Sequence, residues 1–126
     1  MATSKVFRSY LLLLRVDLTI RVLGFGKMYG TVRQSVPHAI PEQQRIPHER
    51  LCRAMDLACV FYPKNVWCLQ RSMATVLLLR GYGWPVELVN GCQISTFENH
   101  AWVELSNLVI NDKPYMNEMY QVLDRC

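Results

Sequence analysis

The chain changes from helical to strand periodicity within residues 68–112, which read CLQRSMATVLLLRGYGWPVELVNGCQISTFENHAWVELSNLVIND. The first part predicts a helix over 68–80 that ends at Gly81. Residues 76–79 are apolar on every side of such a helix. We therefore expect this helix to be central and buried.

The second part of this stretch predicts an antiparallel sheet. Residues 85–90 read as a strand, and residues 99–105 alternate between two faces. Ser106-Asn107 fits a tight hairpin turn, with a return strand over 108–112. We expect residues 115–126 to form a short helical tail.

Two further helices and an irregular arm precede this stretch. Residues 4–24 and 48–61 have helical periodicity, whereas 27–47 contain three prolines and are expected to be irregular. The first helix carries two apolar stripes and is expected to bury both: Leu11, Leu14, Leu18, Val22 and Leu12, Val16, Ile20, Leu23. The apolar face of the second helix comprises Leu51, Met55, Ala58 and either Val60 or Phe61.

The order of these elements predicts an α+β fold, in which N-terminal helices precede a central helix that packs on a small antiparallel sheet. The length of 126 residues suits a single domain, 1–126. Within it we distinguish an N-terminal helix with a Pro-rich arm, 1–47, from a core over 48–126.

Composition excludes several classes of protein. Apolar residues make up 51% of the chain, which is enough for a core and excludes wholesale disorder. The net charge of +4 comes without dense basic clusters, so a nucleic-acid partner is not expected. The apolar run near the N-terminus is broken by Arg15 and Asp17, so neither a membrane span nor a signal peptide is expected.

The cysteine pattern favours reduced thiols in a cytoplasmic protein. The count of five is odd, and no pair has the C-x-x-C spacing. A metal site built from Cys59, Cys68, Cys92 and His100 is a weak alternative, because these spacings form no compact ligand pair. We expect neither a metal nor another cofactor.

Three residues at the ends of predicted elements form a candidate catalytic set: Cys68, His100 and Asp112. The N-terminus of a helix lowers the pKa of a thiol and offers free N–H groups to an oxyanion. A histidine then serves as base and acid, and a carboxylate orients the imidazole. With the turn at 106–107, position 101 faces 112 and position 100 faces about 113, so Asp112 is expected next to His100. A bulge or a longer loop would decide which neighbour faces it. The simpler alternative is a core cysteine, a surface histidine and a turn aspartate.

Four segments together resemble the leader peptidases of lasso-peptide biosynthesis, which are small cysteine proteases of papain/transglutaminase-like fold. These segments are CLQRS at 68–72, LLLRG at 77–81, HAWVE at 100–104 and VIND at 109–112. The resemblance implies that Cys68 is the nucleophile, His100 the general base and acid, and Asp112 the orienting carboxylate. Tyr62 stands where papain-like enzymes have the oxyanion-hole glutamine. The resemblance therefore leaves the oxyanion hole to the backbone N–H of Cys68, with the side chain of Trp67 as a candidate second donor.

The same resemblance implies a bacterial cytoplasmic enzyme that removes the leader from a lasso-peptide precursor. Its partners would be that precursor, a separate leader-recognition protein and, as a further candidate, the lasso cyclase. The N-terminal helix and the arm at 36–47 are candidate docking surfaces, although the helix alone would also complete the core. Arg71 and Arg80 are candidates to meet an acidic leader, or else are ordinary exposed arginines. An acyltransferase or deamidase with the same three residues, and a non-catalytic leader-binding adaptor, are the alternatives.

Overall fold

A computed structural model describes residues 2–93 and 95–126. The helices are α1 (Ala2–Leu23), α2 (Phe25–Gln34), a 3₁₀ turn (Glu42–Gln44), α3 (His48–Phe61), α4 (Cys68–Gly81) and α5 (Met116–Met119). The strands are β1 (Glu87–Gln93), β2 (Glu98–Leu105), β3 (Leu108–Val109) and β4 (Gln121–Arg125). All neighbouring strands pair antiparallel in the order β3-β2-β1-β4.

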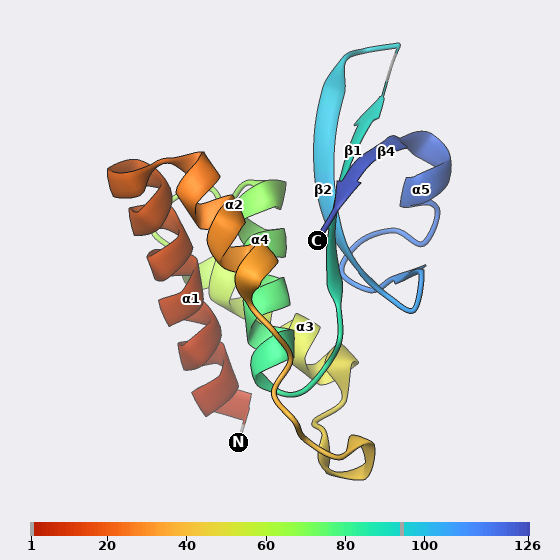
Figure 1. The fold of residues 1–126 in the computed structure, drawn as a ribbon. Helices are drawn as coiled ribbons and strands as arrows, with labels where there is room; N and C mark the ends of the chain where they lie inside the picture. The colour runs from red at the N-terminus through yellow and green to blue at the C-terminus, as the bar shows by residue number, and fades with distance from the viewer. Residues whose placement is uncertain (1, 94) are drawn as a thin grey trace.

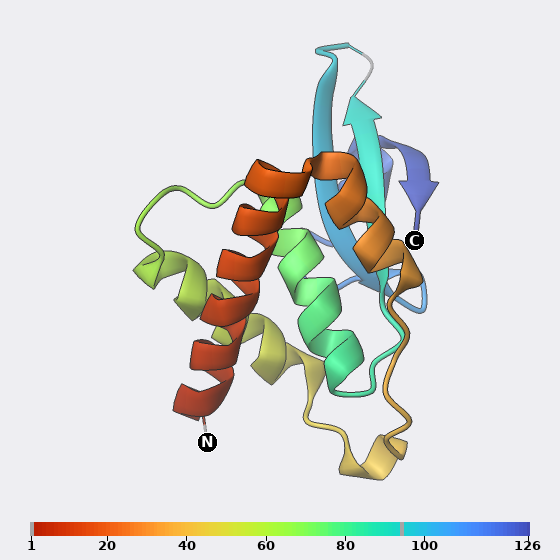
Figure 2. The same ribbon diagram turned by 60° about the vertical axis from the view of Figure 1, so that its left-hand side comes forward.

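The molecule is layered, with α1 to α4 on one side of the sheet and α5 on the other (Figure 1). Both views place α4 between α1 and the sheet (Figure 2). Val76, Leu78 and Leu79 of α4 are completely buried, together with Leu88 and Val103 of the sheet. The prediction of a central, buried helix over 68–80 and that of an antiparallel sheet are therefore confirmed.

The turn between β2 and β3 is the predicted hairpin turn. Ser106 and Asn107 have φ values of 52° and 68°, and two consecutive positive φ values are typical of a type I′ turn. The return strand is shorter than predicted, because ladder pairing stops at Val109. Beyond Val109, a side chain replaces the backbone as acceptor, because the N–H of Val103 donates to Oδ1 of Asn111 at 2.7 Å.

Residues 25–34 form helix α2, so the prediction of an irregular segment over 27–47 is wrong for its first third. Gly24, with a φ of 90°, separates α2 from α1. Met28 and Val32 lie one turn apart and are completely buried in the core. Burial of this pair outweighs the weak helix propensity of the glycines in the segment, because tertiary packing stabilises most protein helices.

The C-terminal segment is mostly strand, which corrects the predicted helical tail. Only residues 116–119 are helical, and residues 121–125 form β4 beside β1. Arg125 of β4 reaches the completely buried Glu104 of β2, with 2.6 Å between Nη1 and Oε1. The indole of Trp102 donates to the other Glu104 oxygen at 2.8 Å. A buried carboxylate needs such partners, and the C-terminal strand supplies one of them.

The apolar stripe of α1 formed by Leu11, Leu14, Leu18 and Val22 is exposed, contrary to the expectation that α1 buries two faces. These side chains are between 38% and 76% exposed. The buried face of α1 contains Ser9, Leu13 and Val16, which are completely covered. Val60 and Phe61 of α3 are exposed as well, although one of them was expected on the apolar face.

Arg80 is buried at the end of α4, which corrects the expectation that it faces an acidic leader. Its Nε and Nη2 donate to the carbonyl of Val86, before β1, at 3.2 and 2.9 Å. Its Nη1 donates to the carbonyl of Val32 at 2.7 Å and to the hydroxyl of Ser35 at 2.8 Å. One guanidinium thus joins α4, the end of α2 and the start of the sheet.

We expect Arg80→Ala to lower the free energy of unfolding by about 3 kcal/mol, because several buried carbonyls lose their donor at once. Urea titration followed by circular dichroism measures this change. The matched control is Arg53→Ala on the exposed side of α3, which should cost less than about 0.5 kcal/mol. Equal effects of the two substitutions would contradict the structural role of Arg80.

Candidate active site

Cys68 is the first residue of α4. Trp67 before it has extended backbone angles, φ −72° and ψ 154°. The helical ladder begins with the bond from the N–H of Arg71 to the carbonyl of Trp67, at 2.9 Å. The N–H groups of the first turn precede this ladder and point out of the helix end, together with the positive end of its dipole. The half-buried Cys68 thiol is free, as are the other four cysteines.

His100 and Asp112 are in direct contact. Nε2 of His100 lies 2.7 Å from Oδ2 of Asp112. Burial by itself raises the pKa of the Asp112 carboxyl, but the hydrogen bond from His100 and that from the backbone N–H of Lys113 outweigh it and hold the pKa below its usual value. An ionised carboxylate only accepts hydrogen bonds, so Nε2 of His100 is the donor in this contact; in a neutral imidazole Nδ1 then keeps its lone pair.

Two aromatic rings hold the imidazole in place. His100 stacks on Tyr120 with centroids 5.4 Å apart and an angle of 22°, and it stacks more distantly on Trp102 at 6.3 Å and 27°. Gly91 pairs with His100 across the sheet. A Cβ at Gly91 would lie 2.6 Å from the Trp102 ring and 2.9 Å from Cβ of Tyr120. This position therefore needs glycine for the two rings to pack beside His100.

A chain of polar contacts ties the segment before Asp112 to α4. The amide of Asn111 donates to the hydroxyl of Ser72 at 3.2 Å, and this hydroxyl donates to the carbonyl of Ala101 at 3.1 Å. Arg71 donates from Nη2 to the carbonyl of Asn111 at 3.2 Å. Sequence analysis did not identify Ser72 and Asn111. The only signal for them was their place inside the CLQRS and VIND segments.

The relative direction of α4 and β2 shows which end of β2 lies near the N-terminus of α4. Arg80, at the end of α4, bonds the residue before β1, and Glu87 of β1 pairs with Glu104 at the end of β2. The two elements therefore run in the same direction. Ser72 contacts Ala101. Cys68 precedes Ser72 by one helical turn and therefore lies toward the start of β2, the end of the strand that contains His100.

A second observation supports this placement. Leu69, next to Cys68, and Asn99, next to His100, line one cavity between α2, α4 and the sheet. The N-terminus of α4 and the start of β2 thus meet at the same place. The structure brings His100 and Asp112 into contact. Cys68 begins the neighbouring helix, and among the described residues its thiol makes no hydrogen bond to His100 or Asp112.

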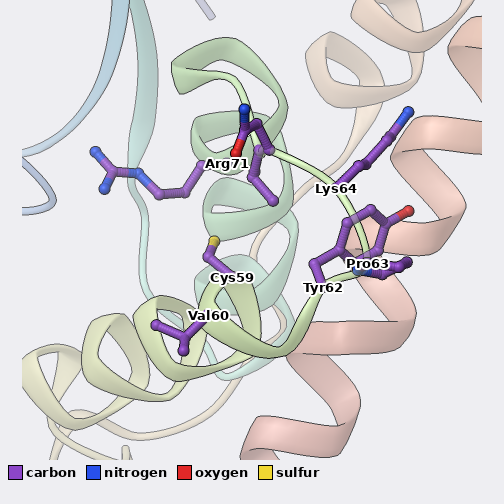
Figure 3. Close-up of a pocket in the computed structure, with 8 residues that line it drawn as sticks. Cys59, Val60, Tyr62, Pro63, Lys64 and Arg71 are labelled. Atoms are coloured by element: carbon purple, nitrogen blue, oxygen red, sulfur yellow. The ribbon is translucent and has the colours of Figure 1, made fainter.

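An open pocket of about 510 Å³ lies next to this helix end (Figure 3). Its lining comes from the end of α3, from the loop that leads to Cys68 and from α4: Cys59, Val60, Tyr62, Pro63, Lys64, Asn65, Val66 and Arg71. Asp17 of α1 holds this loop, because it accepts the hydroxyl of Tyr62 at 2.9 Å and the ammonium of Lys64 at 2.7 Å. The pocket borders the loop that leads to Cys68, and Cys68, His100 and Asp112 are not part of its lining.

The remaining candidates have clear positions. The Trp67 side chain is 77% exposed, and the hydroxyl of Tyr62 is committed to Asp17. The Arg71 guanidinium faces Asp112 and Asn111 as well as Asp56 of α3.

Among residues 2–93 and 95–126, no group of three His, Cys, Asp or Glu side chains is arranged to hold a metal ion. Within the same residues, no helix is both long and apolar enough to cross a bilayer.

Comparison of the sequence with known proteins identifies a family. The family model described as "Transglutaminase-like superfamily" matches residues 10–125. The chain is 26% identical over 125 residues to the "Microcin J25-processing protein McjB" of Escherichia coli. The match includes 94% of this chain but spans only 58% of the length of that relative. No solved structure matches significantly.

The family match and the architecture agree. Helices precede a small antiparallel sheet, as the predicted α+β, transglutaminase-like fold requires. The predicted resemblance to lasso-peptide processing proteins is likewise confirmed by the similarity to McjB. Because the matched region includes nearly all of the sequence, this chain belongs to the transglutaminase-like superfamily.

Proposed function

We propose that this protein is a cysteine peptidase that removes the leader peptide from a lasso-peptide precursor. The contact between His100 and Asp112 beside the N-terminus of α4 carries the proposal. Cys68 at that helix end supplies the nucleophile. The similarity to a microcin J25-processing protein supports the choice of substrate class.

The proposed reaction proceeds through a thioester. His100 takes the thiol proton on Nδ1 while its Nε2–H donates to Asp112, which stabilises the resulting imidazolium. The Cys68 thiolate attacks the carbonyl carbon of the last leader residue, and the backbone N–H of Cys68 donates to the oxyanion. The imidazolium protonates the leaving amine of the core peptide. Water, deprotonated by His100, then hydrolyses the thioester and releases the leader as a carboxylic acid.

The exposed indole of Trp67 leaves the backbone N–H of Cys68 as the principal oxyanion donor in this proposal. An acyltransferase or deamidase is the second candidate, favoured by membership of the transglutaminase-like superfamily. It would differ from the peptidase in the second step, where an amine replaces water, or in the first, where the leaving group is ammonia from a side-chain amide.

A separate leader-recognition protein is the proposed partner, acting in the bacterial cytoplasm, where thiols stay reduced; the lasso cyclase is a further candidate. In this proposal, residues 1–47 present the docking surface and residues 48–126 form the catalytic core. The proposal of a partner protein is supported by the exposed apolar stripe of α1, which contains Leu11, Leu14, Leu18 and Val22. An unpartnered apolar helix face of this kind is typical of an interaction site.

Alkylation of the folded protein with iodoacetamide between pH 5 and 9 tests the proposed pair without a substrate. We expect Cys68 to react at pH 6, because the helix end and His100 favour its thiolate. Cys52 should remain unmodified, since burial raises the pKa of its thiol to about 12 and only 9% of the residue is exposed. His100→Ala should abolish the reaction at pH 6. A Cys68 that reacts only above pH 8, as an ordinary thiol does, would argue against the pair.

Cys68→Ala should reduce cleavage of a lasso-peptide precursor at least about a thousandfold, as loss of a nucleophile does in other peptidases. Circular dichroism should show an unchanged fold. Cys92→Ala is the matched control, because this half-buried thiol lies on β1, and it should cleave at the rate of the natural protein. Mass spectrometry of the products measures both rates. Cleavage by Cys68→Ala at an undiminished rate would refute the thioester mechanism.

The double variant Leu11→Glu/Leu18→Glu should lower cleavage at least about tenfold when the recognition protein is limiting, because it places charges in the exposed stripe. Its alkylation at Cys68 should not change. Leu57→Glu, at a 45% exposed position of α3, is the control and should cleave normally. Equal cleavage by the natural protein, the double variant and the Leu57→Glu control would show that the stripe of α1 is not the docking surface.

A further inference from the structure

Arg71 lies one turn into α4 and makes polar contacts in two directions. Toward the site, its Nη2 donates to the carbonyl of Asn111 at 3.2 Å and lies 3.7 Å from Oδ2 of Asp112. Toward α3, its Nη1 lies 3.9 Å from Oδ1 of Asp56. The side chain is 29% exposed. Its Nε is buried and, in the part of the chain that the structure describes, has no hydrogen-bond partner.

The segment that Arg71 contacts lies beyond the last ladder pair of β3, after the N–H of Ile110 donates to the carbonyl of Val103 at 3.0 Å. Ladder pairing of β3 ends at Val109, two residues before Asn111. Side-chain contacts attach residues 111–112 to α4 and to β2. The amide of Asn111 provides one attachment, through Ser72 and Val103. The contact with His100 holds Asp112 from β2. The guanidinium of Arg71 provides a further attachment, at the backbone of Asn111 and the carboxylate of Asp112.

We propose that Arg71 is a positioning residue, whose guanidinium holds the Asn111–Asp112 segment on α4 and thereby sets the orientation of His100. The positioning of His100 by Arg71 does not depend on the proposed function. Only the expected effect on the reactivity of Cys68 rests on that function. The contact of Asp112 with His100 transmits the position of the segment to the imidazole.

An arginine suits this position better than a lysine. The planar guanidinium presents donors in fixed directions, so Nη2 faces the site while Nη1 faces α3. An ammonium is a single point charge and cannot span both directions. Burying the unpaired Nε costs free energy, and the two contacts of Nη2 offset this cost.

The charges around the site act together with Arg71. Asp56 and Cys59 of α3 face it from one side, and Tyr120 lies against the imidazole of His100 from the other. The positive charge of Arg71 adds to the two hydrogen bonds that hold the pKa of Asp112 below its usual value against the effect of burial. Arg71 follows Cys68 by three residues, so the two side chains lie on one face of α4.

Two measurements test this role in Arg71→Gln and Arg71→Lys, with Arg53→Gln as the control. The first is the tautomer of His100, measured by long-range ¹H–¹⁵N NMR at pH 8 in a Cys68→Ala background, where no thiolate perturbs the ring. We expect only the Nε2–H tautomer in that background and with Arg53→Gln. Arg71→Gln should give a mixture of tautomers, and Arg71→Lys should restore the single tautomer only in part.

The second measurement is the pH profile of Cys68 alkylation. At pH 6 we expect about a tenfold loss of rate for Arg71→Gln, the size expected for loss of a hydrogen bond to a charged group. Arg71→Lys should lose less. A purely structural role would change the thermal unfolding midpoint but leave the tautomer and the pH dependence unaltered.

Unchanged tautomer and alkylation in Arg71→Gln would overturn the inference. If that variant does not fold, Arg71→Lys decides, and full agreement with the natural protein in both measurements would overturn it. The NMR result does not depend on the thiol. A Cys68 that is unreactive at low pH, together with an Arg71-dependent tautomer, would therefore refute the proposed function and leave the positioning role standing.

Discussion

The hydrogen bonds that join α4 to β2 through Asn111 are the constraint on which the rest of the site depends. Ser72 bonds Ala101 directly and receives the amide of Asn111, whose oxygen accepts the N–H of Val103. These contacts replace a strand ladder that is only two residues long in β3. They determine how far α4 lies along β2, and hence which residue of β2 the N-terminus of α4 approaches. A shift of one helical turn would move that end by about 5.4 Å, beyond hydrogen-bond distance from any fixed group.

Elsewhere in the fold, buried charges serve as connection points between distant segments. Arg80 joins α4 to the end of α2 and the start of the sheet, and Glu104 joins β2 to Arg125 of β4. Each group would be costly to bury alone, so each requires a particular partner. The elements attached in this way, α2 and β4, are those whose structure the sequence did not predict.

Prediction from sequence succeeded where the signal was local and failed where it was distant. The long apolar run before Gly81 and the Ser106-Asn107 pair gave the central helix and the hairpin correctly. Burial of Met28, in contrast, depends on a core formed by residues far along the chain. Hairpin register predicted that Asp112 lies near His100, and the structure adds the direct contact between the two side chains. The roles of Ser72 and Asn111 did not, because their hydrogen bonds span 29 and 39 residues.

Helix α1 connects the proposed docking surface with the site. One face exposes the apolar stripe that includes Leu14 and Leu18, while Asp17, between them along the chain, holds the loop before Cys68 through Tyr62 and Lys64. Burial alone raises the pKa of Asp17, but the hydrogen bonds from Lys64 and Tyr62 outweigh it and keep the carboxylate ionised. Under the proposed function, a protein seated on the stripe would contact the same helix that holds one wall of the pocket. Recognition of the leader and approach of its last residue to Cys68 would then share a single rigid element.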